Sequence, residues 1–305
     1  MLDDYELISR MIACLPASDG ADERPVSGGV SSGVTDWLAG MRDSRVPNMP
    51  ALPTPVNPIN IEAVVARWSG LTIADFIDVA ASVSLDPLES ERRFTVEEDV
   101  NIDCDQLPNI CVIGKADQRR RVVDYGFAVT PFGECLIGMT DGAICELSFQ
   151  SVTEREAAVA RLRATWPRLA DRPDNALAGE LAEKVFARRV ALVGPVAPVE
   201  PVNLIVVATD FQLAVWRSLI RIPRGGVTSY GKIAEQIGSP TASRAVGAAV
   251  GANPIGYLIP CHRVVPKSGG TGNYRWDSLR KRAMLCREKA EVSLYFNTSP
   301  SRHRH

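Results

Sequence analysis

The sequence predicts an α+β fold, with a small antiparallel sheet followed by a mostly helical region that contains a helix-turn-helix. Three short strand-like runs separated by turn signals lie between residues 125 and 149 and predict the sheet. Helical periodicity dominates from Asp210 onward, and strands followed by helices are typical of this fold class. A stretch rich in Pro, Gly and Ser at residues 18–60 and a helical pattern at residues 60–90 together predict a partly disordered and helical extension before the sheet.

With 305 residues, the chain is too long for one ordinary domain and suits two or three. Composition and pattern divide it into five expected segments. These are a flexible segment (1–59), a helical segment (60–121), a strand-and-helix domain (122–205), a helical domain (206–290) and a tail (291–305).

The elements of the two domains follow in order from their residue patterns. Strands are expected where β-formers lie between turn signals, and helices where apolar residues recur at helical spacing. The expected strands are 125–130, 134–139, 143–149 and 204–208, and the expected helices are 153–165, 176–187, one from Asp210, 229–237 and 241–252.

The net charge of −2 conceals a division along the chain. Residues 211–290 hold 13 Lys and Arg against three acidic residues, whereas the remainder holds 21 basic against 33 acidic residues. A basic segment in a slightly acidic protein is typical of a surface that binds a polyanion, although a solvated basic face is the simpler alternative.

Seven cysteines form no CxxC pair, so we expect free thiols in a reducing compartment. No stretch approaches the roughly 18 apolar residues of a membrane span, and the acidic start does not resemble a secretory signal. These features predict a cytoplasmic protein with no membrane partner.

Two short helices across a turn at Gly238-Ser239-Pro240 predict the helix-turn-helix. The second helix begins near Ala242 and Ser243 and consists mostly of small residues, which allows close approach to a partner surface. Tight packing inside a core would explain the small residues equally well. Arg244 within this stretch favours nucleic acid as the partner.

Cys261 is followed directly by His262, the only histidine outside the terminal tail. A cysteine becomes a nucleophile as the thiolate, which requires a base or a positive field nearby. Adjacency alone is weak support, because neighbours on an extended strand point to opposite faces. A small buried hydrophobe is the commoner role of a single cysteine.

The residues around this cysteine resemble the active-site signature of the O6-alkylguanine-DNA alkyltransferases of the Ada and Ogt kind, in the run Pro260-Cys261-His262-Arg263-Val264-Val265. The resemblance covers about residues 122–290, with ordered matches at 211–216, 227–230, 243–247, 253–254 and 272–276. It implies a ribonuclease H-like fold for the strand-and-helix domain. It also implies DNA repair by direct reversal, in which the alkyl group of O6-alkylguanine moves irreversibly to Cys261; O4-methylthymine is a second candidate substrate.

The resemblance assigns a role to each matched residue of the active site. Cys261 would attack the alkyl carbon, His262 would take the thiol proton through an ordered water, and Glu288 would orient His262. Asn253 would brace the turn before the active-site strand, and Tyr274 would donate a hydrogen bond towards the leaving guanine. The base pocket would be lined by Val264, Arg275 and Trp276. The protein would act once per molecule, with no cofactor and no metal.

The implied partner is double-stranded DNA that contains O6-alkylguanine. Because the damaged base is stacked inside the duplex, its nucleotide must be flipped out before a thiolate can reach it. Tyr230 would press on the phosphate 3′ to the target, Arg244 would fill the vacated stack, and the helix from Ala242 and Ser243 would enter the minor groove. We expect a monomer, associated with the nucleoid.

Two features depart from the family pattern. Asp277 stands where relatives of the Tyr-Arg-Trp type usually have glycine, so it would either disturb the DNA-facing loop or point to solvent. Trp276 would narrow the pocket and favour methyl over benzyl adducts. Residues 60–90 faintly resemble the end of an AraC-type regulatory domain, which makes residues 60–121 a degenerate regulatory segment or a simple extension.

Three other functions stay open at this point. A damage-binding protein without alkyl transfer would lack the acceptor cysteine. A methylation-triggered transcriptional activator would need the front-end DNA-binding and metal-sensing motifs that the sequence lacks. A Cys-His hydrolase would need an oxyanion hole and would leave the helix-turn-helix unexplained.

Overall fold

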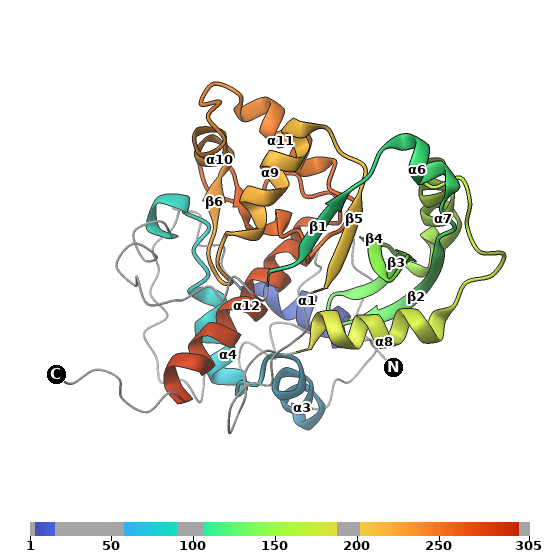
Figure 1. Cartoon of the computed structure of the whole chain (residues 1–305). Coiled ribbons are helices and arrows are strands. Elements are labelled where there is room, and N and C mark those ends of the chain that lie inside the picture. Colours follow the sequence, from blue (N-terminus) through green and yellow to red (C-terminus); the bar gives the residue numbers. More distant parts are fainter. Residues whose placement is uncertain (1–3, 16–57, 91–106, 188–201, 299–305) are drawn as a thin grey trace.

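The computed structural model describes residues 4–15, 58–90, 107–187 and 202–298 (Figure 1). The expected flexible stretch at 18–60 therefore lies almost entirely outside the described residues. The main elements are α1 (Asp4–Cys14), α3 (Pro58–Ser69), α4 (Ile73–Ala81), β1 (Asn109–Val112), α6 (Lys115–Arg120), β2 (Asp124–Thr130), β3 (Gly133–Thr140), β4 (Ala143–Phe149), α7 (Arg155–Thr165), α8 (Asn175–Phe186), β5 (Asn203–Val206), α9 (Asp210–Ile220), β6 (Thr228–Ser229), α10 (Tyr230–Gln236), α11 (Ser243–Gly251), β7 (Val264–Val265) and α12 (Ser278–Thr298).

The larger sheet has five strands in the order β1-β5-β4-β3-β2. Strands β2, β3 and β4 are antiparallel neighbours, as predicted. The expected small antiparallel sheet describes only these three strands, because β5 pairs in parallel with both β4 and β1. Both β1 and β5 have only four residues and lie far apart along the chain, so neither the alternation of their side chains nor a connecting turn could reveal this pairing.

The turns of this sheet follow from their residues. At the β3–β4 hairpin, Asp141 and Gly142 both have positive φ, at 49° and 73°. An Asp-Gly pair adopts this conformation readily, which matches the twist of the two flanking strands. The helices α7 and α8 pack on β3 and β2, and a capping box between Ser151 and Glu154 precedes α7.

The helical region from Asp210 carries α9, α10 and α11 next to one another, and Figure 1 shows them beside the sheet edge formed by β1 and β5. Helix α9 starts at a capping box in which Thr209 and Gln212 exchange hydrogen bonds. The Trp216 indole N–H donates to the carbonyl of Ala249 at 2.9 Å, which ties α9 to α11. A two-residue parallel pair, β6 and β7, joins the start of α10 to the chain after Cys261.

The helices in front of the sheet belong to the same apolar core as the helical domain. Helices α1, α3 and α4 all pack against α12 (Figure 1). On α1, Ile8, Met11 and Ile12 are fully buried. On α3, the Trp68 indole N–H donates to the carbonyl of Pro131 at 2.7 Å and its ring meets Phe132 edge to face.

The structure differs from the expected segments at three places. A helix, α1, lies within residues 1–59. The sheet takes up β1 from within residues 60–121. Helix α12 continues past residue 290 to Thr298. None of the described helices is long and apolar enough to cross a membrane.

Candidate active site

Cys261 begins a short 3₁₀ turn, Cys261–Arg263, directly before β7. The turn is fixed by its backbone, since the N–H of Arg263 donates to the carbonyl of Pro260 at 3.0 Å. The thiol is 4% exposed. Its sulfur receives a hydrogen bond from Asn253 Nδ2 at 3.3 Å and lies 3.8 Å from the Tyr274 hydroxyl. The structure thus brings together three of the predicted residues around one sulfur atom.

Further hydrogen bonds of Asn253 fix the position of this turn. Its Nδ2 also donates to the carbonyl of Ile259 at 2.8 Å, and its Oδ1 accepts from the N–H of Ile255 at 2.9 Å. One buried side chain therefore links the end of α11 to the segment that leads into Cys261. This geometry agrees with the bracing role that the resemblance implied for Asn253.

Burial raises the pKa of the Cys261 thiol above its ordinary value. Hydrogen bonding with Asn253 and Tyr274 and the charge of Lys281 act in the opposite direction and offset part of this rise. The resting cysteine is therefore protonated at neutral pH. A reaction that needs the thiolate must supply a proton acceptor at the site.

His262 has the arrangement of such an acceptor. It is fully buried, and its Nε2 lies 3.0 Å from Glu288 Oε1. Burial lowers the pKa of His262, and the carboxylate of Glu288 offsets only part of this decrease. The ring is therefore neutral at pH 7. Because a carboxylate only accepts, Nε2 carries the proton and Nδ1 is the free acceptor. Among the described residues, Nδ1 has no hydrogen-bond partner.

Glu288 is held as a carboxylate by several donors. Arg263 donates to its Oε2 from Nε at 3.0 Å and to its Oε1 from Nη2 at 2.7 Å, and the N–H of Gly225 adds a bond at 3.2 Å. Burial alone would raise the pKa of Glu288, but Arg263 and His262 outweigh it and hold this pKa well below its ordinary value. The carboxylate can therefore orient His262 across the physiological pH range.

Two residues that the sequence did not single out complete the site. The Lys281 ammonium donates to the carbonyls of Val264 and Thr271, at 2.6 Å each. Burial lowers its pKa to about 8, an effect that Cys261 partly opposes. Tyr257 stacks on His262 with the rings 5.8 Å apart and 12° from parallel, and its hydroxyl accepts from Arg224 at 2.8 Å. The seven-residue spacing of Lys281 and Glu288 on one helix face was the available signal for the lysine.

The predicted DNA-side residues lie on α10 and at the start of α11. Tyr230 is partly buried, and its pKa is raised by burial and by the nearby Cys261 thiol. Ser243 and Arg244 are exposed and Ala242 is partly exposed. A Cβ on Gly247 of α11 would lie 3.8 Å from the Tyr230 ring, so a small residue there keeps the two helices close.

The three predicted pocket residues are placed differently from one another. Val264 is buried, and its carbonyl is held by Lys281. Trp276 is 7% exposed and packs edge to face on Tyr274, with ring centres 5.6 Å apart. Arg275 is exposed and donates to the carbonyl of Asn253 at 3.4 Å. The tryptophan therefore contacts Tyr274, whose hydroxyl lies 3.8 Å from the Cys261 sulfur.

Comparison with known proteins agrees with this geometry. Residues 210–290 match the family model described as "6-O-methylguanine DNA methyltransferase, DNA binding domain". This part of the chain belongs to the alkyltransferase family. The match contains Cys261, His262 and Glu288.

Relatives extend the similarity beyond the alkyltransferase domain. The regulatory protein Ada of Salmonella typhimurium is 36% identical over 170 residues, which are 54% of this chain and 45% of that protein. The methylated-DNA–protein-cysteine methyltransferase of Mycobacterium tuberculosis is 52% identical over 84 residues, 28% of this chain and 51% of that protein. The chain thus spans about half the length of these curated relatives.

A solved structure of the O6-methylguanine methyltransferase of Mycobacterium tuberculosis is also similar. It shares 33% identity, and the match covers 55% of this chain and 94% of that one, with a TM-score of 0.43.

Asp277, where the resemblance led us to expect glycine, has a backbone conformation that glycine adopts most readily. Its φ is +82°, in the left-handed region. The side chain is exposed, and its Oδ1 accepts from the N–H of Leu279 at 3.2 Å in the first turn of α12. The carboxylate therefore caps the helix that carries Lys281 and Glu288.

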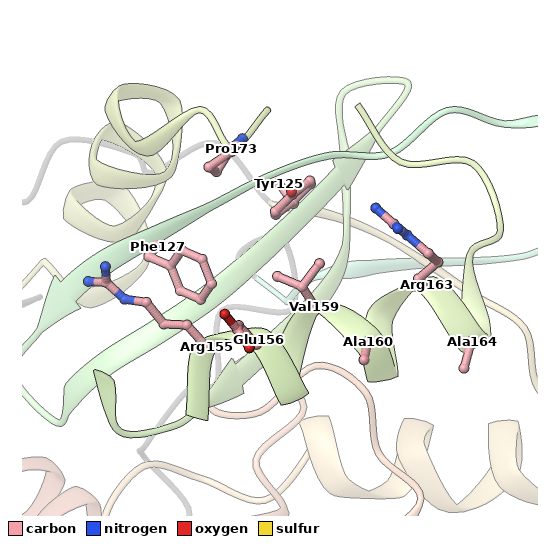
Figure 2. Close-up of a pocket in the computed structure, with 9 residues that line it drawn as sticks. All are labelled: Tyr125, Phe127, Arg155, Glu156, Val159, Ala160, Arg163, Ala164 and Pro173. Carbon is pink, nitrogen blue, oxygen red and sulfur yellow. The ribbon is translucent and has the colours of Figure 1, made fainter. Parts of the chain in front are cut away.

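One cavity among the described residues lies away from Cys261. It has a volume of about 620 Å³ and lies between β2 and α7, with Phe127, Val159 and Arg163 among its lining residues (Figure 2). No predicted site residue lines it. A smaller cavity of about 170 Å³ lies between α7 and the alkyltransferase domain and includes Arg275 in its wall.

Proposed function

We propose that this protein repairs DNA by removing the alkyl group from O6-alkylguanine and keeping it on Cys261. The observation that carries the proposal is the arrangement around one sulfur atom. Asn253 and Tyr274 contact Cys261, and the adjacent His262 is buried, neutral and backed by the carboxylate of Glu288. All five residues have the types and positions that the resemblance implied.

The reaction follows from these groups. His262 Nδ1 accepts the thiol proton through a water, and the thiolate attacks the alkyl carbon. The new S–C bond forms as the C–O6 bond breaks, and the electron pair of that bond passes to guanine. Guanine takes up one proton in exchange for the one that left the thiol, and the Tyr274 hydroxyl donates a hydrogen bond to it. Since no group at the site can cleave the thioether, each molecule reacts once.

Binding to double-stranded DNA is the second part of the proposal. We assign α10 and α11 as a helix-turn-helix whose second helix enters the minor groove, because its small residues and exposed Arg244 suit close approach to a duplex. Arg244 fills the stack that the flipped nucleotide leaves, and Tyr230 presses on the phosphate 3′ to it. The surplus of basic residues in 211–290 supplies the contacts to phosphates.

The same proposal covers the finer points of architecture and location. We infer a ribonuclease H-like fold for the sheet region, supported by a mixed five-stranded sheet with α7 and α8 packed on it. That the protein acts as a monomer in the cytoplasm, associated with the nucleoid, is part of the same proposal. The preference for methyl over benzyl adducts, O4-methylthymine as a substrate, and the absence of a cofactor and a metal stay predictions.

Loss of the lesion from DNA tests this function. A duplex with one O6-methylguanine is mixed with increasing amounts of protein, and the digested DNA is assayed for the modified base. The proposal predicts a linear loss that stops at one lesion per protein molecule. Repeated turnover would indicate a hydrolytic enzyme instead, and tight binding without loss would indicate a damage-recognition protein.

A further inference from the structure

A short segment that precedes the sheet in the sequence lies against β6 and β7, the two strands next to the active site. Residues 83–90, named here the strap, follow α4 and run beside β6 in Figure 1. They lie outside the 210–290 region that matches the alkyltransferase family model. Nothing in the reaction proposed above uses them.

Two contacts join the strap to β6 and β7. Leu85 is 6% exposed and forms an apolar cluster with Val227, Val265 and Leu285. Ser90 Oγ accepts a hydrogen bond from the N–H of Val227 at 2.8 Å, although the two residues are 137 positions apart. Both residues are buried, so this bond satisfies a backbone donor that water cannot reach.

The strand pair that the strap contacts connects the two halves of the site. Thr228 pairs with Val264 and Ser229 pairs with Val265. Tyr230 follows directly after β6, and the Cys261 turn ends directly before β7. A ladder of two residues per strand is marginal without support from its surroundings.

The strap continues from α4, a helix that packs into the apolar core. Phe76 of α4 is fully buried and meets Trp68 of α3 edge to face at 5.9 Å. The guanidinium of Arg287, next to Glu288 on α12, lies 5.8 Å from the centre of the Trp68 ring. The strap therefore connects α12, which carries Glu288, to the β6–β7 pair. Strand β6 directly precedes Tyr230, and β7 directly follows the Cys261 turn.

We propose that Leu85 and Ser90 are positioning residues that hold the β6–β7 pair, and with it the spacing between Tyr230 and Cys261, in the geometry that alkyl transfer needs. The inference rests on the proposed function. Tyr230 fixes the flipped nucleotide and Cys261 receives its alkyl group. A loosened strand pair would therefore misplace the nucleotide relative to the Cys261 sulfur. Misplacement of this kind lowers the rate of the chemical step more than it lowers affinity for DNA.

The test compares four full-length variants. Ser90→Ala removes the acceptor of the Val227 N–H, and Leu85→Ala removes the apolar contact. Ser90→Thr keeps the hydroxyl and serves as rescue. Leu88→Ala is the matched control, because Leu88 is on the same segment but 51% exposed.

Two readouts are measured well below the melting temperature of each variant. The first is the single-turnover rate constant of methyl transfer at saturating duplex. The second is hydrogen exchange of the backbone amides in peptides covering 227–232 and 261–266. We expect Ser90→Ala and Leu85→Ala to lower the rate constant about tenfold and to speed exchange in both peptides, with Ser90→Thr and Leu88→Ala within about twofold of the unchanged protein.

A lowered melting temperature with unchanged rate and exchange would overturn the proposal and leave the strap as a stabilising contact only. Unchanged exchange in both peptides, whatever the transfer rate, would overturn it as well. If the unchanged protein transfers no methyl group, the proposed function fails. The exchange measurement then still decides whether the strap holds the strand pair.

Discussion

Glu288 Oε1 lies 3.0 Å from His262 Nε2 and 2.7 Å from Arg263 Nη2, with all three side chains buried. The Glu288 carboxylate thus interacts with both residues that follow Cys261 in the sequence. It balances the guanidinium charge and fixes which nitrogen of the imidazole carries the proton. The base at this site depends on a residue 26 positions further along the chain.

Replacement of Glu288 should damage both activity and stability. In Glu288→Gln the amide can no longer balance Arg263, and a buried charge left without its partner costs about 3–5 kcal/mol of unfolding free energy. The transfer rate should fall by about a hundredfold, because the neutral amide no longer stabilises the positive charge that His262 acquires when it takes the thiol proton. Single-turnover kinetics and thermal unfolding measure the two effects. Glu235→Gln, at an exposed position of α10, is the control; equal effects of the two variants would contradict the assignment.

The pH dependence should follow His262. Burial lowers its pKa, so the neutral base persists below the ordinary value near 6.5. The transfer rate should stay within about twofold from pH 8, where Lys281 is about half charged, to about pH 6.5, and decline below that. Below about pH 6.5 the unfolded chain binds a proton on this histidine that the folded protein does not, so stability should decrease as the pH falls. Denaturant unfolding at several pH values measures this. A transfer rate that already halves at pH 7.5 would contradict the assignment of His262 as the base.

Lys281 should lower the pKa of the thiol that it faces. Lys281→Met removes a positive charge that favours the Cys261 thiolate, and it leaves the carbonyls of Val264 and Thr271 without their donor. The pH midpoint for alkylation of Cys261 by iodoacetamide should therefore rise, and methyl transfer at pH 7.5 should slow by about tenfold. Lys267→Met, at an exposed position, is the control. An unchanged midpoint in Lys281→Met would show that the ammonium does not act on the sulfur.

Asp277 should matter for stability and little for repair. Asp277→Ala keeps the left-handed backbone but loses the bond to the Leu279 N–H, so it should lower the free energy of unfolding by about 1 kcal/mol. Asp277→Asn accepts the same bond and tolerates positive φ, so its stability should stay within about 0.5 kcal/mol. Asp277→Gly should change the transfer rate less than about twofold. A large gain in rate would show that the carboxylate disturbs DNA binding instead.

Local pattern was enough to predict most elements of the two domains. The strands β2, β3 and β4 and the helices α7 to α11 were predicted close to their bounds, because alternation, helical spacing and turn residues act over short distances. The parallel pairing of β1 with β5 was missed, since such pairing depends on residues far apart along the chain. Helix α1 was missed because it is short and stands beside a stretch of turn-forming residues.

The candidate site was predicted from motif positions, and the contacts between them came from the fold. The sequence placed Cys261, His262, Asn253 and Tyr274 in one motif series, and the structure brings them together as expected. The roles of Lys281, Tyr257 and Ser90 arise only where separate elements meet. The resemblance of residues 60–90 to an AraC-type domain stays a prediction.

The most direct test of the account is the mass of the protein after reaction. The protein is mixed with excess duplex containing O6-methylguanine and examined by intact mass and peptide mapping. We expect a gain of one methyl group, about 14 Da, located on Cys261 and absent in Cys261→Ala. A protein that binds the duplex while its mass never changes would contradict alkyl transfer to Cys261.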